Sequence, residues 1–93
     1  MTIDVRYHNI LQRAAGTEHE TIELPAGASI AEAVKHLATH HGMPLREMLL
    51  GPDGNVASYL VIFRNGQLVG QKQLQLSLAD GDELMLFLAI SGG

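Results

Sequence analysis

The hydrophobic positions of the chain alternate with polar ones in three segments. Apolar residues recur at every second position in 2–8, toward the end of 18–24, and in 83–90. This period of two predicts strands that bury one face. Residues 59–63 are apolar on both faces, which favours a strand inside a sheet. Asn65-Gly66 then predicts a tight hairpin turn, with a short returning strand at 67–69.

One segment, 29–41, has the period of an amphipathic helix. Ser29 and Glu32 have the spacing of a capping box, in which each side chain bonds a free backbone N–H of the first turn. One stripe of this helix is apolar: Ile30, Ala33, Val34, Leu37 and Ala38. Gly42 is placed to end the helix in a left-handed conformation, and Pro44 cannot continue it. We therefore expect one main helix that packs a single face on the sheet.

The remaining segments predict connections. Residues 9–16 fit a turn or a short helical loop, 44–50 fit a short second helix or an apolar loop, and 51–55 and 80–82 fit turns. The order of elements is strand, strand, helix, strand, short strand, strand, which is an α+β layout with a mixed sheet. The helix is long enough to serve as a crossover, and a right-handed crossover is strongly preferred. We expect the last strand to lie beside the first. This arrangement is a β-grasp, or ubiquitin-like, fold, with residues 1–93 in a single domain.

Composition limits the classes of function. A chain of 93 residues makes one domain and leaves little room for a deep catalytic cleft. Charged residues make up 17%, below the usual value of about 25%, so the surface carries more apolar area than a solitary monomer needs. The net charge is −4 and the six Lys and Arg residues are scattered, which argues against a nucleic-acid partner. The absence of Cys excludes a disulfide scaffold, a thiolate zinc site and a cysteine nucleophile.

Two further expectations concern location and metals. No apolar run approaches the ~20 residues of a membrane span, and the start of the chain does not resemble a signal peptide. We therefore expect a cytoplasmic protein with no membrane partner. His36 and His40 are spaced one helical turn apart, but no carboxylate or Cys joins them in the sequence. A solvated helix face explains this pair better than a metal site, and no metal is predicted.

The end of the chain carries the most specific signal. Residues 78–93 read Leu-Ala-Asp-Gly-Asp-Glu-Leu-Met-Leu-Phe-Leu-Ala-Ile-Ser-Gly-Gly. Together with the Asn65-Gly66 turn and the helix after Ser29, this segment resembles the MoaD/ThiS family of ubiquitin-like sulfur carriers. Members of that family have a similar Asp-Gly-Asp-Glu turn before the last strand and end in Gly-Gly. Residues 44–59 bring this chain closer in length to molybdopterin-synthase small subunits and cysteine-biosynthesis carriers than to the compact ThiS members.

The resemblance implies a carrier and not an enzyme. An E1-like adenylyltransferase would use ATP to adenylate the Gly93 carboxylate, which a sulfur donor would then convert to a thiocarboxylate. Ser91 and Gly92 would let a flexible tail reach into the partner's active site. No cofactor would bind to the chain itself. A sulfur-accepting synthase subunit or enzyme would receive the sulfide, with molybdopterin synthesis as the leading pathway and cysteine, thiamine, tRNA thiolation or specialised sulfur metabolism as alternatives.

The last predicted strand also has a second apolar face. Leu84, Leu86, Leu88 and Ile90 share one face. Met85, Phe87 and Ala89 share the other, and we expect Val61 and Phe63 to continue that face on a neighbouring strand. Two interpretations stay open. Either residues 44–50 cover this second face, or it is a docking patch for the E1-like enzyme.

Two other functions compete with the sulfur carrier. Ubiquitin-like protein modifiers also end in Gly-Gly, and Gly93 would then be joined to lysines of target proteins. A plain β-grasp interaction subunit is the third possibility, in which the two glycines at the end are incidental. The sulfur carrier is favoured because the turn, the strand and the Gly-Gly end occur together at the spacing of the family.

Overall fold

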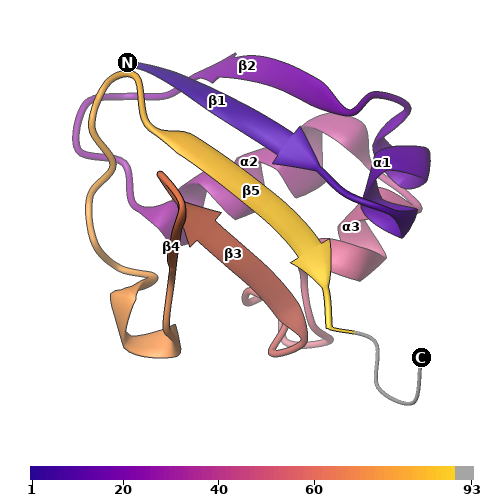
Figure 1. Cartoon of the computed structure of the whole chain (residues 1–93). Helices are drawn as coiled ribbons and strands as arrows, with labels where there is room; N and C mark the ends of the chain where they lie inside the picture. Colours follow the sequence, from indigo (N-terminus) through magenta and orange to yellow (C-terminus); the bar gives the residue numbers. More distant parts are fainter. Residues whose placement is uncertain (90–93) are drawn as a thin grey trace.

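The computed structural model describes residues 1–89 and shows a five-stranded mixed sheet with helices behind one face (Figure 1). The strands are β1 (Thr2–Tyr7), β2 (His19–Glu23), β3 (Leu60–Arg64), β4 (Gln67–Leu68) and β5 (Glu83–Leu88). The helices are α1 (Ile10–Ala15), α2 (Ile30–His41) and α3 (Leu45–Leu49), with a 3-10 turn at Gln71–Gln73. In this part of the chain no helix has the length and apolar character needed to span a bilayer.

Strand β5 lies in the middle of the sheet, whose order is β2-β1-β5-β3-β4. It runs parallel to β1 and antiparallel to β3, while β1 with β2 and β3 with β4 form antiparallel hairpins. The last strand therefore lies beside the first, which confirms the β-grasp topology. At the β3–β4 turn, Asn65 and Gly66 both have positive φ values, 50° and 83°, as a two-residue hairpin requires.

The core lies between the sheet and the three helices. Helix α2 begins at the predicted capping box, with Ser29 Oγ accepting from the Glu32 N–H at 3.1 Å and Glu32 Oε1 accepting from the Ser29 N–H at 3.0 Å. The five residues of its predicted apolar stripe are all buried. Leu84 and Leu86 of β5 are completely buried against this layer. Every second side chain of β5 thus points toward the helices, and these side chains are the leucines, as predicted.

The end of α2 differs in one detail from the sequence-based expectation. Gly42 has the expected positive φ of 68°, but its ψ of −154° lies outside the left-handed helical region. The reason is visible in the next turn, where the Gly42 carbonyl accepts a hydrogen bond from the Arg46 N–H at 2.9 Å. The glycine therefore ends one helix and starts another, because α3 follows three residues later.

The position of helix α3 shows which face of the sheet residues 44–50 cover. Leu45 and Leu49 are completely buried in the core cluster, and α3 packs against α2. All three helices thus lie on the same side of the sheet (Figure 1). Residues 44–50 do not cover the face formed by Met85 and Phe87, which was the alternative that the sequence left open.

The turn before β5 ties three parts of the sheet together. Asp80 Oδ1 accepts from the Thr2 N–H at 2.7 Å, and the Gly81 N–H donates to the Thr2 carbonyl at 2.8 Å. The Asp82 carboxylate accepts from Arg64 Nε at 2.9 Å, from Asn65 Nδ2 at 2.9 Å and from the Ala79 N–H at 2.8 Å. This turn therefore sets the start of β5 against both β1 and the β3–β4 hairpin.

A polar cluster lies under the sheet near the end of α2. The pairing of Val5 with Glu20 places Glu20 on the helix side of β2. Glu20 Oε2 accepts a hydrogen bond from Tyr7 Oη at 2.6 Å and lies 2.5 Å from His41 Nε2. Burial works to raise the pKa of Glu20, but the Tyr7 and His41 hydrogen bonds and the His41 and His40 charges outweigh it, so the pKa falls below its ordinary value. Burial, reinforced by Glu20, raises the pKa of Tyr7, which therefore stays a donor.

Glu20→Gln is expected to lower the free energy of unfolding by about 1–2 kcal/mol at pH 7, because the neutral amide weakens two hydrogen bonds to a largely buried group. The lowered pKa means that ionised Glu20 stabilises the fold above its ordinary pKa of 4.5, and that this stabilisation is lost as the pH falls through the lower folded value. Urea unfolding at pH 7 and at about pH 3 measures both effects, with the exposed Glu18→Gln as control. An equal difference from wild type at both pH values would contradict the assignment.

Candidate functional site

The candidate site is the end of β5, where the described part of the chain stops. The Ala89 N–H donates to the Tyr59 carbonyl at 2.9 Å, and on the other side the His8 N–H donates to the Leu86 carbonyl at 3.1 Å. Because β5 has a neighbouring segment on each side and buried leucines beneath it, the backbone at its end is held in place. The predicted tail residues Ser91, Gly92 and Gly93 lie outside the described residues.

The outer face of β5 carries the predicted apolar residues. Val61 pairs with Phe87 and Phe63 pairs with Met85 across β3 and β5. The rings of Phe63 and Phe87 stack with centroids 5.8 Å apart and planes 19° from parallel. All four side chains are half-buried, and Ala89 beyond them is exposed. The structure thus brings the predicted residues together on one open face.

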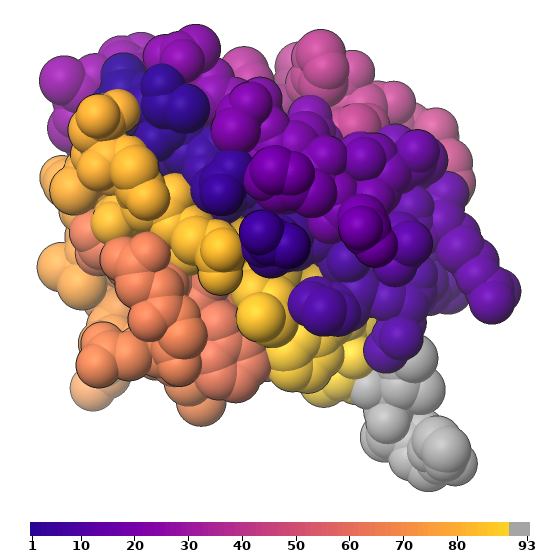
Figure 2. Space-filling model, turned by 45° about the horizontal axis from the view of Figure 1, so that its top comes forward, coloured from indigo at the N-terminus to yellow at the C-terminus, as the bar shows by residue number. Residues whose placement is uncertain are grey.

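One further apolar residue joins this face. Leu68 of β4 pairs with Phe63 and is 64% exposed. Sequence reasoning missed it, because the face of a two-residue strand follows only from its pairing register. We call the set Val61, Phe63, Leu68, Met85 and Phe87 the outer patch. Figure 2 shows β5 reaching the surface as a band between β1 and β3.

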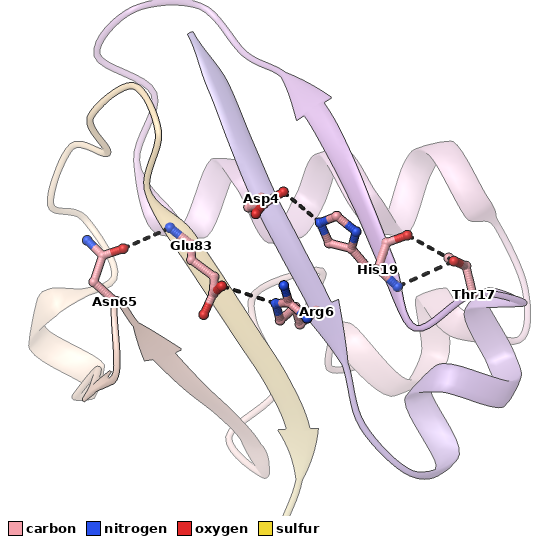
Figure 3. A network of polar contacts seen from close by, with 6 residues as sticks. All are labelled: Asp4, Arg6, Thr17, His19, Asn65 and Glu83. Carbon is pink, nitrogen blue, oxygen red and sulfur yellow. Dashed lines mark hydrogen bonds and ion pairs between the residues drawn. The ribbon is translucent and has the colours of Figure 1, made fainter.

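Charged side chains border the outer patch on the β1 side (Figure 3). Arg6 is level with Met85 in the parallel pairing, and its Nε donates to Glu83 Oε2 at 3.1 Å. Further out, His19 Nε2 lies 2.7 Å from Asp4 Oδ1. The surface therefore changes from apolar over β3–β5 to charged over β1–β2, which is the layout of a docking patch with a polar rim.

Three histidines meet at the end of α2, where the His40 ring lies edge-on to the His41 ring, with centroids 5.2 Å apart. The rings of His36 and His40 stack with centroids 6.2 Å apart. Within residues 1–89, no group of three or more His, Cys, Asp or Glu side chains is placed to hold a metal ion. His41 contacts Glu20, and no signal in the sequence pairs two residues that lie so far apart.

Known proteins share both the sequence pattern and the fold. The model of the ThiS family matches residues 5–93. Small archaeal modifier protein 1 of Haloferax volcanii is 30% identical over 83 residues, covering 89% of this chain and 91% of that protein. Its crystal structure superposes with a TM-score of 0.87 at 27% identity and covers 100% of both chains.

Two converting-factor proteins have the same fold. A putative molybdopterin converting factor subunit 1 from Pyrococcus furiosus is 26% identical, with a TM-score of 0.78 over 97% of this chain and 99% of that one. A structure of the complex of subunits 1 and 2 of the Helicobacter pylori molybdopterin-converting factor matches with a TM-score of 0.61 at 20% identity, covering 100% of both chains. At that identity the likeness concerns the fold alone.

These matches agree with the geometry of the site. The family model extends through β5 to residue 93, so the match includes the Asp-Gly-Asp-Glu turn, the central last strand and the Gly-Gly end. The relatives are a small modifier and a converting-factor subunit of similar length. The chain therefore belongs to the ThiS family, a group of ubiquitin-like carrier and modifier proteins.

Proposed function

We propose that this protein is a sulfur carrier that uses the carboxylate of Gly93. An E1-like enzyme supplies ATP, the carboxylate oxygen attacks the α-phosphorus, and pyrophosphate leaves. A hydrosulfide nucleophile then attacks the acyl carbon, and AMP leaves with the former carboxylate oxygen, so that a thiocarboxylate remains. The observation that carries the proposal is the family match through residue 93, on a strand whose end is held from both sides. The chain binds no cofactor of its own, and the chemistry takes place in the partners.

Molybdopterin synthesis is the proposed destination of the sulfur. The Pyrococcus furiosus relative bears the name of a molybdopterin converting factor subunit, and a protein of the same fold from Helicobacter pylori was solved as a complex with its subunit 2. A larger synthase subunit would accordingly receive the tail of this chain. Reconstitution with candidate synthase subunits tests this destination, and transfer to a cysteine, thiamine or tRNA pathway enzyme instead would replace it.

A second candidate is conjugation to proteins. It is favoured by the name of the Haloferax volcanii relative, a small modifier protein. Both functions begin with adenylation of Gly93 and differ in the nucleophile that follows, which is sulfide for the carrier and a lysine amine for the modifier.

Intact mass measured on the protein from its native cells separates these functions. Replacement of one oxygen by sulfur at the C-terminus supports the carrier, whereas lysine-linked conjugates support the modifier. If neither species is found and a chain without Gly92 and Gly93 still functions, the proposal is wrong and the glycines are incidental.

We further propose that the outer patch docks the E1-like enzyme. Phe87→Lys is expected to lower kcat/KM for adenylation about tenfold, because it places a charge in the centre of an apolar contact. Thr21→Lys is the matched control, since it adds the same charge to the same face on β2, which is about 10 Å from β5. ATP–pyrophosphate exchange measures both. If both variants fold and react at equal rates, the outer patch is not part of the interface.

A further inference from the structure

A second exposed surface surrounds the end of β5. Five large apolar side chains are exposed in residues 1–89, and Ile10, Met43 and Tyr59 are 41%, 60% and 44% exposed. The Tyr59 carbonyl accepts a hydrogen bond from the Ala89 N–H. Ile10 begins α1, which follows β1 at the same end of the sheet, because β1 and β5 are parallel. Ile10 and Tyr59 therefore lie near the end of β5, and none of the three residues belongs to the outer patch.

Met43 and Tyr59 also line a hollow of about 450 Å³ beside α3. Its wall includes Arg46 and Glu47, and Tyr59 Oη donates to the Glu47 carbonyl at 3.1 Å, which fixes the ring at the edge of the hollow. Among residues 1–89, Arg46 has no carboxylate within ion-pair distance. The hollow thus offers an apolar edge beside a cation. We call Ile10, Met43, Arg46 and Tyr59 the exit rim.

The position of the reacting carboxylate limits what can cover the exit rim. In the proposed function this carboxylate belongs to Gly93, and residues 90–93 separate it from Ala89. Fully extended, they reach at most about 14 Å. An enzyme that acts on the Gly93 carboxylate must therefore place its reactive centre within this distance of Ala89. The enzyme surface around that centre then meets Tyr59, which bonds Ala89, and the hollow that Tyr59 lines together with Met43 and Arg46.

We propose that the exit rim is a second contact surface for the adenylating enzyme, separate from the outer patch. That enzyme inserts an apolar side chain at the edge formed by Met43 and Tyr59, and presents an acidic group to Arg46. The inference rests on the proposed function. It assigns a role to residues 43–59, the segment that contains α3 and lengthens the chain.

The double variant Met43→Ser/Arg46→Glu tests this proposal. Leu76→Ser/Lys72→Glu is the matched control, since it makes the same two changes in exposed residues at the other end of the molecule. The Leu76 carbonyl accepts from the Ile30 N–H at the start of α2, whereas Met43 follows the end of that helix. A 12-residue helix separates the two positions by about 18 Å.

The readout is ATP–pyrophosphate exchange by the adenylating enzyme of the source organism, with the full chain as the varied substrate. The rim variant is expected to raise KM for the chain about tenfold while kcat at saturation stays near wild type. The control is expected to change KM less than about twofold. The conservative Met43→Leu/Arg46→Lys variant should restore most of the loss, since it keeps the apolar edge and the charge.

If the rim variant is folded, as thermal unfolding shows, and its KM equals that of the control, the exit rim is not a contact surface. If the double variant does not fold, Arg46→Glu alone decides, because its side chain is exposed on α3. If Gly93→Ala is inactive while the rim variant matches wild type, the proposed function stands and this inference fails. If wild type itself supports no exchange, both fail.

Discussion

Gly93→Ala is expected to abolish activation and leave the fold unchanged. The carboxylate that reacts is attached to this residue, and a methyl group beside it would meet the walls of the channel through which the tail enters. A displacement of about 1 Å at a reacting atom costs about a hundredfold in rate, so the loss should exceed that factor. The last described backbone hydrogen bond of this strand is that of Ala89, four residues before Gly93, so the thermal unfolding midpoint should match wild type.

The measurement is thiocarboxylate formation by intact mass, together with ATP–pyrophosphate exchange. Deletion of Gly93 should have the same effect, since it moves the carboxylate back by one residue. Ser91→Ala is the matched control, because it makes a side chain of the tail smaller and should react at close to the wild-type rate. Normal thiocarboxylate formation by Gly93→Ala would overturn the proposed function.

Asp82→Ala is expected to have the largest effect on stability, a loss of about 2–4 kcal/mol of unfolding free energy. Its side chain is 10% exposed and pairs with Arg64, with an Nη2–Oδ2 distance of 2.7 Å. Removing the carboxylate would leave the Arg64 guanidinium, the Asn65 amide and the Ala79 N–H without their acceptor. The start of β5 would lose its attachment to the β3–β4 hairpin.

Urea unfolding checks this expectation, with Glu18→Ala as a control at an exposed acidic residue. Burial works to raise the pKa of Asp82, but the bonds from Ala79, Asn65 and Arg64 outweigh it and hold the pKa below its ordinary value of 3.8. Ionised Asp82 therefore stabilises the fold above that pH, and the difference between wild type and variant should shrink as the pH falls below it. A loss within about 0.5 kcal/mol at pH 7, equal to the control, would contradict the role given to Asp82.

This role explains the Asp-Gly-Asp-Glu motif in physical terms. Asp80 and Gly81 bond Thr2 at the start of β1, and Asp82 bonds the hairpin on the other side. The motif forms a turn, as the sequence-based interpretation predicted. It holds the central strand in place, and the end of that strand is bonded to Tyr59 through Ala89.

Local signals in the chain were sufficient for the five strands, the main helix and their order. The capping box at Ser29, the turn at Asn65-Gly66 and the alternation in β5 each act within a few residues, so they are readable without a partner strand. The inward face of β5 was predictable for the same reason, because leucines at every second position demand a buried side. The family resemblance rested on the same local features and on the Gly-Gly end.

Contacts between residues that lie far apart in the sequence could be identified only from the tertiary structure. Leu45 and Leu49 suited either face of the sheet until packing against α2 placed them on the helix side and left the outer patch open. Glu20, His41 and Tyr7 meet only because β1, β2 and α2 converge. The exit rim likewise combines the starts of α1 and α3 with the turn before β3. Periodicity in a sequence reports which sides of an element are apolar, whereas what covers each side depends on how the elements pack.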